Sequence, residues 1–582
     1  RNLNPVALSK IVASPHAASC HQQLSAQRCP SSKISASLQG MLSSLLLFAT
    51  LLPALGVSKS DLGEELRHLA GGRLRLRGLR SNASQAIVTR HNRFHHNRYE
   101  GQGKINVWPV PNSVESGSAS ATLSPAVKFT GDISDEHVAT SILRYKELMF
   151  PHECESCASG ANIQRISVSL VGEGSDESYV LQATPDLIEI SAAKPVGVQY
   201  ALETLSQLVS FNFDKMQYET QAALPLTVRD EPRFSHRGLL VDSSRHFLPV
   251  TLLKRVIDSM SYAKLNRLHW HVTDAQSFPI NSRVDPELAE KGAWSQRERY
   301  TPEDVKSVVN YADLRGIVVV PEFDMPGHTK SWGAARPELM SFTDDRFSDG
   351  NSAALDPTNP RTYELVDSVL QDWMVGREGK PAFFQSPYVH LGTDEVPFNA
   401  WKTKGYPVGL FRDFVSHAFK SAKGLGKEVV MWEEAFKDGP PPPESIIQVW
   451  LDGSIARRAA EGGYRVILSE GWYLDHLDKT AEFMYNRNPS DYVDSDKTSN
   501  LIGGEGCMWG ETVDGGDMEQ TIWPRLGAVA ERLWSPPGEH WSRAKPRLAA
   551  FRCLLLERGI PAGTLEGHGR STPPGPGSCG SQ

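Results

Sequence analysis

Short apolar runs alternate with amphipathic segments along the chain from residue 233 to its end. Eight runs turn from apolar to polar or aromatic at their C-terminal ends: RGLLVD, LNRLHWHVTD, GIVVVPEFD, YVHLGTDE, KEVVMWEEAF, SIIQVWLD, YRVILSEGWYLD and NLIGGEGCMWGE. Segments with helical spacing of apolar residues, such as VTLLKRVIDSMSYAKL and GLFRDFVSHAFKSAKGLG, lie between them. This alternation predicts an α/β fold, a (β/α)8 TIM barrel with a C-terminal tail over residues 233–582. A doubly wound open sheet is the alternative.

The preceding segment, residues 105–232, has a different pattern. IQRISVSLV, ESYVLQA and LIEISAA alternate apolar and polar residues as half-buried strands do, and VGVQYALETLSQLVSF follows with helical spacing. The pattern predicts a small α+β domain ahead of the barrel. Its residues indicate no chemistry of their own.

Residues 1–57 are predicted to be an N-terminal extension and a signal peptide. Met41 opens MLSSLLLFATLLPALGVSKS, whose apolar centre is short and ends near small residues that a signal peptidase accepts. A signal anchor is the alternative, but we expect no stable membrane span in the mature form. Residues 58–104 are predicted to be an Arg-rich linker or pro-segment, and they carry the glycosylation sequon at Asn82. Together these features predict the secretory pathway, with a lysosome, a vacuole or the extracellular space as destination.

Composition and charge exclude two classes of protein. Of the 582 residues, 40% are hydrophobic and 13 are tryptophan, which suits a chain with large buried cores rather than a disordered one. The 61 basic and 68 acidic residues give a net charge of −7. Without a basic excess, nucleic acid is not expected as a partner.

The cysteines indicate at most a few disulfides. If Cys20 and Cys29 belong to a removed extension, five cysteines remain, so at least one thiol stays free. In an oxidising compartment Cys553–Cys579 is a plausible disulfide across the Pro/Gly-rich tail, and Cys507 is the candidate for the free thiol. A zinc site at Cys154-x-x-Cys157 is a weak alternative because no second pair lies nearby.

The C-terminal ends of the predicted strands collect groups that suit a sugar. They are Arg237, Asp242, Arg245, His269, His271, Asp274, Glu322, Asp324, His328, Asp394, Glu395, Trp432, Trp450, Tyr473, Asp475, Trp509 and Glu511. Tryptophan faces pack on pyranose rings and acyl methyl groups, whereas carboxylates and arginine bind hydroxyls. Barrel active sites lie at this end of the strands. The sequence therefore predicts a carbohydrate site.

Two other hypotheses remain open at this point. His269-x-His271 with His328 resembles the ligand set of a metal-dependent barrel hydrolase, although both histidines belong to the longer motif HWHVTD. A carbohydrate-binding protein that has lost its chemistry would keep the same pocket. The presence of Asp394, Glu395 and Tyr473 argues against the second hypothesis.

Six motifs resemble the β-N-acetylhexosaminidases of glycoside hydrolase family 20. They are HRGLLVDSSRHFLPV, LNRLHWHVTD, PEFDMPGHTKSW, HLGTDEV, GWYLD and GGEGCMWGE, in the family's order, and the similarity runs from Trp108 to about Cys579. The resemblance implies an exo-acting glycosidase that removes terminal β-linked N-acetylglucosamine or N-acetylgalactosamine. It also implies no cofactor, no metal and a possible assembly into a homodimer.

The adjacent acidic pair indicates how the reaction proceeds. Two carboxylates that flank a sugar normally come from separate elements, whereas Asp394 and Glu395 are neighbours in sequence. The substrate's own acetamido group is therefore expected to act as nucleophile and to form an oxazolinium ion. Glu395 would be the general acid and base. By resemblance, Asp394 would accept the acetamido N–H and Tyr473 would bond the attacking carbonyl oxygen.

The resemblance assigns the remaining site residues. Trp432, Trp450 and Trp509 would enclose the acetamide methyl group, Arg237 would hold the 3- and 4-hydroxyls, and Asp475 and Glu511 would reach O6 and O4. Asp274, Asp324 and His328 would support the acid. His476 follows Asp475, where family members vary in charge, and it is expected to favour a sulfate on O6 at acidic pH. Thr393 stands where glycine is common in the family and is expected to be tolerated.

Overall fold

The computed structural model describes residues 105–152, 154, 157, 160–342 and 353–565. All of them belong to one compact unit, Val88–Gln582. The predicted signal peptide, the Arg-rich segment with Asn82, and Cys579 lie outside the described residues.

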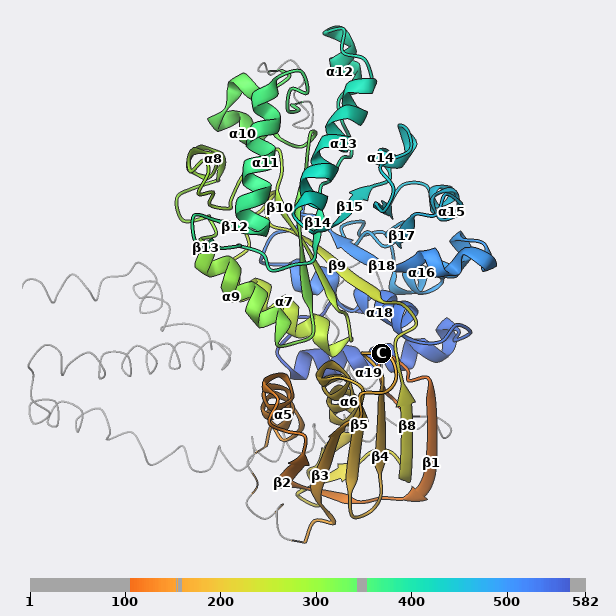
Figure 1. Ribbon diagram of the computed structural model, residues 1–582. Coiled ribbons are helices and arrows are strands. Elements are labelled where there is room, and N and C mark those ends of the chain that lie inside the picture. Colours follow the sequence, from red (N-terminus) through yellow and green to blue (C-terminus); the bar gives the residue numbers. More distant parts are fainter. Residues whose placement is uncertain (1–104, 153, 155–156, 158–159, 343–352, 566–582) are drawn as a thin grey trace, which may run out of the picture. The chain divides into compact units, whose positions relative to one another are not determined.

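The small domain is an eight-stranded mixed sheet with two helices (Figure 1). The strands in their order across the sheet are β1 (Ser113–Ala119), β8 (Leu224–Asp230), β4 (Tyr179–Ala183), β5 (Ile188–Ala192), β3 (Ile163–Leu170), β2 (Thr122–Gly131), β7 (Gln217–Thr220) and β6 (Val209–Asn212). Burial alternates along β4 and β5, as the sequence pattern predicts. Helices α5 (Glu136–Met149) and α6 (Pro195–Gln207) pack side by side.

The second part is a closed barrel of eight parallel strands (Figure 1). Its strands are β9 (His236–Asp242), β10 (Arg267–Thr273), β11 (Val318–Phe323), β14 (Tyr388–His390), β15 (Glu428–Trp432), β16 (Ile446–Val449), β17 (Arg465–Leu468) and β18 (Leu501–Met508). Every predicted run contains one of them, and β18 pairs with β9 to close the barrel. The predicted (β/α)8 barrel preceded by a small α+β domain is therefore confirmed, and the open sheet is excluded.

Helices follow the strands of the barrel along the chain. They are α7 (Val250–Tyr262), α8 (Glu287–Gly292), α9 (Pro302–Asp313), α10 (Lys330–Ala335), α11 (Pro360–Met374), α12 (Phe398–Thr403), α13 (Gly409–Gly424), α14 (Glu434–Lys437), α15 (Gly453–Glu461), α16 (Ala481–Tyr485), α17 (Met518–Ile522), α18 (Arg525–Trp534) and α19 (Trp541–Glu557). Their starts follow local chemistry. Thr301 and Asp304 form a capping box at α9, and Asp452 caps α15.

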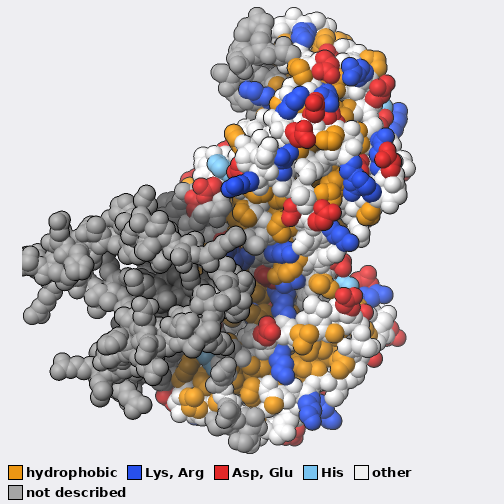
Figure 2. All heavy atoms as spheres, turned by 90° about the vertical axis from the view of Figure 1, so that its left-hand side faces the viewer, with side chains coloured by type: hydrophobic (Ala, Val, Ile, Leu, Met, Phe, Trp, Pro, Cys, Tyr) orange, Lys and Arg blue, Asp and Glu red, His pale blue; other side chains and the backbone are white. Residues whose placement is uncertain are grey.

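Short elements complete the described chain. They are the strands β12 (Gly376–Arg377) and β13 (Lys380–Pro381) and the 3-10 helices η5 (Pro337–Leu339), η6 (Pro489–Tyr492) and η7 (Ser495–Asn500). Each described helix falls short of the length and hydrophobicity that crossing a bilayer requires. On the face seen in Figure 2, acidic and basic side chains are interspersed over the described surface.

The cysteines contradict the zinc-site alternative and confirm that Cys507 is a free thiol. Cys154 and Cys157 form a disulfide with an S–S distance of 1.96 Å, so neither thiol can bind zinc. Cys507 is buried in β18 and free. Cys553 is disulfide-bonded. The predicted identity of its partner, Cys579, is not tested, since Cys579 lies outside the described residues.

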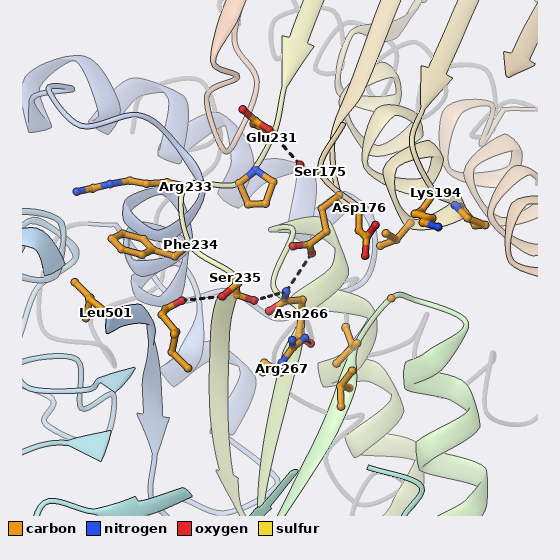
Figure 3. Close-up of a pocket in the computed structure, with 18 of the residues that line it drawn as sticks. Ser175, Asp176, Lys194, Glu231, Arg233, Phe234, Ser235, Asn266, Arg267 and Leu501 are labelled. Carbon is orange, nitrogen blue, oxygen red and sulfur yellow. Dashed lines mark hydrogen bonds between the residues drawn. The ribbon is translucent and has the colours of Figure 1, made fainter. Parts of the chain in front are cut away.

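A cavity of about 1300 Å³ opens at the N-terminal end of the barrel (Figure 3). Arg267 and Val318, the first residues of β10 and β11, line it together with Asp176 and Lys194 of the small domain. None of the predicted sugar-site residues lines this cavity. It is therefore separate from the strand ends at which barrel enzymes act.

Candidate active site

The predicted catalytic residues lie where the barrel strands end. Asp274 follows β10, Asp324 follows β11, Asp394 and Glu395 follow β14, and Tyr473 lies beyond β17. Because the parallel strands of the closed barrel share one orientation, all these positions face the same end of the barrel. The fold thus brings together carboxylates that come from distant parts of the chain.

His328 connects four of these carboxylates. Its Nδ1 atom lies 3.2 Å from Oδ1 of Asp274. Its Nε2 atom lies 3.4 Å from Oε2 of Glu395, 3.6 Å from Oδ2 of Asp394 and 4.0 Å from Oδ2 of Asp324. Asp274 is held in turn by Arg245 at 2.9 Å. His328 thus contacts the acid Glu395 directly, whereas Asp274 reaches it only through His328. The predicted support of the acid by these two residues stays a prediction.

These contacts set the charges of the group. Burial alone would lower the pKa of His328, but the neighbouring carboxylates, that of Asp274 first, raise it well above its usual value. They therefore favour the imidazolium form of His328, with a proton on both nitrogens. Burial, followed by the Asp394 charge, raises the pKa of Asp324 well above its usual value. Asp324 thus keeps a proton and hydrogen-bonds Asp394.

The two neighbouring acids differ in exposure. The Glu395 side chain is 45% exposed, whereas that of Asp394 is 11% exposed. Among the described residues, the buried Oδ1 atom of Asp394 has no hydrogen-bond partner. A buried carboxylate oxygen without a donor is costly, so this atom is suited to accept an N–H from a bound ligand. Glu395 is suited to reach a leaving group.

The backbone around the acids is strained. His328, Thr393 and Glu395 have φ angles of 55°, 83° and 45°. Such angles are uncommon for residues with a Cβ atom and are unfavourable for a β-branched one. The expectation that Thr393 is readily tolerated is therefore incomplete, since it occupies a conformation that glycine adopts at lower cost.

Aromatic side chains form one wall of the site. Trp432, Tyr473 and Trp509 pack in one buried cluster with Cys507 and Leu240, and Trp450 packs against it. Trp450 stacks on Tyr473 with ring centroids 5.7 Å apart and an interplanar angle of 20°. Burial raises the pKa of Tyr473 well above its usual value, so its hydroxyl remains a donor.

Asp475 and Glu511 also lie at the strand ends, as predicted. Oε1 of Glu511 is 3.6 Å from the Arg245 guanidinium. Oδ1 of Asp475 is buried and has no hydrogen-bond partner among the described residues. Both acids can therefore bind sugar hydroxyls. His476 is largely exposed and lies 3.8 Å from Asp475.

The interpretation of Arg237 as a sugar-binding residue is wrong. Arg237 is the second residue of β9 and lies at the N-terminal end of the barrel, fully buried. Its guanidinium donates to Glu177 and Tyr200 of the small domain and to the carbonyl oxygens of Phe234 and Lys264. Arg245, just beyond the other end of β9, lies among the active-site carboxylates instead.

An inner row of histidines and glutamates links the strands inside the barrel. The sequence gives no role to His390 and Glu505, and it gives His269, His271 and Glu322 only as strand-end groups, with the two histidines as a metal-site alternative. Glu322 accepts the indole N–H of Trp432 at 2.8 Å and contacts the rings of His269, His271 and His390. Glu505 contacts His269 at 2.6 Å. The signal was present, because each of these residues alternates with apolar neighbours inside a strand and so points into the barrel.

Two clusters have the geometry of metal ligands. His269, Glu322 and His390 form one, and Asp274, Asp324 and His328 form the other. Glu505 and Glu322, outweighing the effect of burial, raise the pKa of His269 to about 9. A metal ion in either cluster would have to displace a proton from His269 or from His328, because only a neutral imidazole binds a metal. The metal-dependent alternative therefore stays untested.

Comparison with known proteins agrees with this geometry. Residues 234–537 match Glycosyl hydrolase family 20, catalytic domain, and residues 104–230 match its domain 2. Beta-hexosaminidase 3 of Arabidopsis thaliana is 36% identical over 522 residues, which cover 83% of this chain and 95% of that protein. Beta-hexosaminidase subunit beta of Homo sapiens is 36% identical over 445 residues, covering 71% and 78%.

Solved structures agree as well. The GH20 exo beta-N-acetylglucosaminidase of Vibrio harveyi in complex with N-acetylglucosamine superposes with a TM-score of 0.69 at 27% identity, covering 80% of this chain and 81% of that one. The Flavobacterium johnsoniae chitobiase gives 0.68 at 28% identity, covering 79% and 74%. The chain belongs to glycosyl hydrolase family 20.

Proposed function

We propose that Asp394 and Glu395 divide the catalytic work of an exo-acting β-N-acetylhexosaminidase. The substrate is a glycan, glycoconjugate or chitooligosaccharide that ends in a β-linked N-acetylhexosamine. The observation that carries the proposal is the different placement of the two neighbouring acids. Asp394 offers a buried oxygen without a donor, and Glu395 is half exposed beside the protonated His328.

Glu395 transfers its proton to the glycosidic oxygen as the bond to C1 breaks. The acetamido carbonyl oxygen attacks C1 and closes the oxazolinium ring, with its positive charge shared by the acetamido nitrogen. Asp394 accepts the N–H of that group and stabilises the developing charge. The Tyr473 hydroxyl donates to the acetamido oxygen and orients it.

Water then opens the ring from the side that the leaving group vacated. Glu395, now a carboxylate, takes a proton from this water, and the sugar leaves with its original anomeric configuration. His328 lies between Asp274 and the acids, and its positive charge stabilises the carboxylate that Glu395 becomes when it gives up its proton in the first step. Asp324 keeps Asp394 in place through a hydrogen bond.

The remaining groups form a pocket for one terminal sugar. Arg245 takes the role assigned from sequence to Arg237, and Asp475 and Glu511 bind further hydroxyls. Trp432, Trp450 and Trp509 enclose the acetamide methyl group. A pocket that holds a single sugar by its hydroxyls explains exo-action.

The proposal also covers the cellular location of the enzyme and its oligomeric state. The Cys154–Cys157 disulfide supports an oxidising compartment, in agreement with a lysosomal, vacuolar or extracellular destination. A homodimer is expected from the resemblance, and sedimentation velocity on the purified protein tests it.

Turnover of two chromogenic substrates tests the chemistry. The 4-nitrophenyl β-N-acetylglucosaminide should be hydrolysed rapidly, and the matching β-glucoside, which lacks the acetamido group, should be almost inert. Comparable rates on both would refute participation of the acetamido group. No turnover of either would support a binding protein without catalysis.

A further inference from the structure

Two consecutive glutamates beyond β15 have no part in the mechanism above, and both contact Trp450. Oε2 of Glu433 accepts the backbone N–H of Trp450 at 2.9 Å and that of Leu451 at 3.0 Å. Oε2 of Glu434 accepts the indole N–H of Trp450 at 3.1 Å. One glutamate therefore holds the main chain of Trp450, and the next holds its ring.

The Trp450 ring depends on these hydrogen bonds for its position more than the rings of the other tryptophans in the cluster do. Trp432 and Trp509 are 1% and 8% exposed, and packing fixes their rings, whereas Trp450 is only partly buried at the edge of the cluster. Its ring has the Tyr473 ring on one side and meets Trp432 at 66° with centroids 6.5 Å apart. Because the Trp450 ring is packed on fewer sides, the hydrogen bond to its indole N–H determines the orientation of the ring.

We infer that Glu434 is a positioning residue which, by holding the Trp450 ring, sets the depth of the pocket for the N-acyl group. The inference rests on the proposed function, in which this ring encloses the acetamide methyl group. Glu434 acts through the ring and contacts no substrate atom. It therefore governs which acyl chains are accepted rather than the chemical step itself.

The protonation of Glu434 suits this role. Burial, followed by the Asp394 charge, raises the pKa of Glu434 to about 8. At acidic and neutral pH its carboxyl group is neutral, so it can accept the indole N–H without adding a second negative charge beside Asp394. A glutamine at this position keeps the same acceptor and the same lack of charge.

The test compares Glu434→Gln with Glu434→Leu on N-acetyl and N-propionyl glucosaminides. We expect Glu434→Leu to change the ratio of kcat/KM for the two substrates by about five-fold, the factor that one neutral hydrogen bond supplies. The change should come mainly from KM. Glu434→Gln should keep the wild-type ratio, which serves as the matched control.

Trp450→Phe, which removes the indole N–H, completes the test. The double variant Glu434→Leu/Trp450→Phe should have the same ratio of kcat/KM for the N-acetyl and N-propionyl substrates as Trp450→Phe alone. The contact between the two residues is already lost in Trp450→Phe. An unchanged ratio in Glu434→Leu, or equal shifts in both backgrounds, would overturn the inference. If the wild type fails to hydrolyse the N-acetyl substrate at all, it is the proposed function that fails.

Discussion

Strand β9 has a buried arginine near each end, and the two have different surroundings. Arg237, at the N-terminal end, donates from all three nitrogens to fixed partners, among them Glu177 at 3.0 Å. Arg245, beyond the C-terminal end, lies among Asp242, Asp274 and Glu511. Residue type and burial are the same, so neither feature distinguishes a structural arginine from a functional one.

The difference lies in whether the neighbouring acceptors are satisfied. Around Arg237 the polar groups of the small domain and the barrel pair with each other, as Lys264 does with Asp230 at 2.8 Å. At the end of the barrel where Arg245 lies, the buried oxygens Oδ1 of Asp394 and Oδ1 of Asp475 lack partners among the described residues. Pairing is not complete at the other end either, since Arg233 and Arg267 each have a buried nitrogen without such a partner, and Lys264 has a φ angle of 56°. The C-terminal end differs because its unsatisfied atoms are carboxylate oxygens, which can accept hydrogen bonds from a ligand.

The largest expected effect is at the C-terminal end. Glu395→Gln removes the transferable proton but keeps the shape of the side chain, so kcat on the N-acetylglucosaminide should fall by about 10²–10⁴-fold. Binding of the product sugar, measured by calorimetry, should change little. A variant that keeps kcat within a few-fold of the wild type would show that Glu395 is not the acid.

The two arginines should differ in their effect on activity. Arg237→Met removes the cation paired with Glu177, which keeps only its hydrogen bonds from Tyr200 and Asn266, and losing one member of a buried pair costs about 3–5 kcal/mol. We expect a lower midpoint in urea unfolding with nearly unchanged kcat/KM of the folded enzyme. Arg245→Met also breaks buried pairs, with Asp242 and Asp274, and in addition it removes the charged hydrogen bonds that we propose to the sugar, so kcat/KM should fall by about 10–100-fold.

To compare the two variants, kcat/KM is measured at a temperature at which circular dichroism shows that both are folded. If Arg237→Met loses more kcat/KM than Arg245→Met under that condition, the assignment of the two ends is wrong.

The strands and the pair Asp394-Glu395 could be predicted from sequence because local patterns determine them. Each barrel strand is a short apolar run between helical segments, and its polar tip marks the C-terminal end. Position along a strand is harder to predict. Arg237 was grouped with the strand-end residues, although it stands at the start of β9 and its partner Glu177 comes from the other domain.

The roles of Glu322 and Glu434 could not be predicted from sequence for a similar reason. Glu322 acts on rings from β10 and β14, and Glu434 acts on Trp450 beyond the next strand. Such contacts depend on strand register and on the direction of side chains across the barrel. The sequence shows which residues face inward, but not which of them meet.

A smaller effect is expected on the hydrolysis of substrates that carry a sulfate near Asp475. Burial raises the pKa of Asp475 to about 6 despite the opposing effect of His476, and Glu511 adds to the rise. The carboxyl group is therefore neutral below pH 6 and negative above it. Since only the negative form repels a sulfate, the ratio of kcat/KM for a 6-sulfated over an unsulfated N-acetylglucosaminide should rise as pH falls from 7.5 to 4.5. About five-fold is expected for one exposed charge pair.

Two variants separate the contributions to this ratio. Asp475→Asn should give a ratio that no longer depends on the ionisation of this carboxyl group. His476→Leu should reduce the ratio if the His476 side chain helps to bind the sulfate, and solvent around this exposed side chain keeps the effect small. Identical pH slopes in all three proteins would leave both residues without a role in the tolerance of sulfate.

The smallest effect is on stability at Thr393. Its φ angle of 83° is unfavourable for a β-branched side chain, and its hydroxyl is buried without a partner among the described residues. Thr393→Gly relieves both costs but adds freedom to the unfolded chain, so we expect a net stabilisation of about 0.5–1 kcal/mol in urea unfolding. The backbone N–H that donates to Asp324 at 3.2 Å is retained, so kcat should stay within two-fold, or about 0.4 kcal/mol.

Thr393→Ala, which removes the hydroxyl but keeps a Cβ atom, is the matched control and should recover only part of the gain. A destabilised Thr393→Gly would mean that packing of the threonine methyl group outweighs the strain next to the catalytic pair.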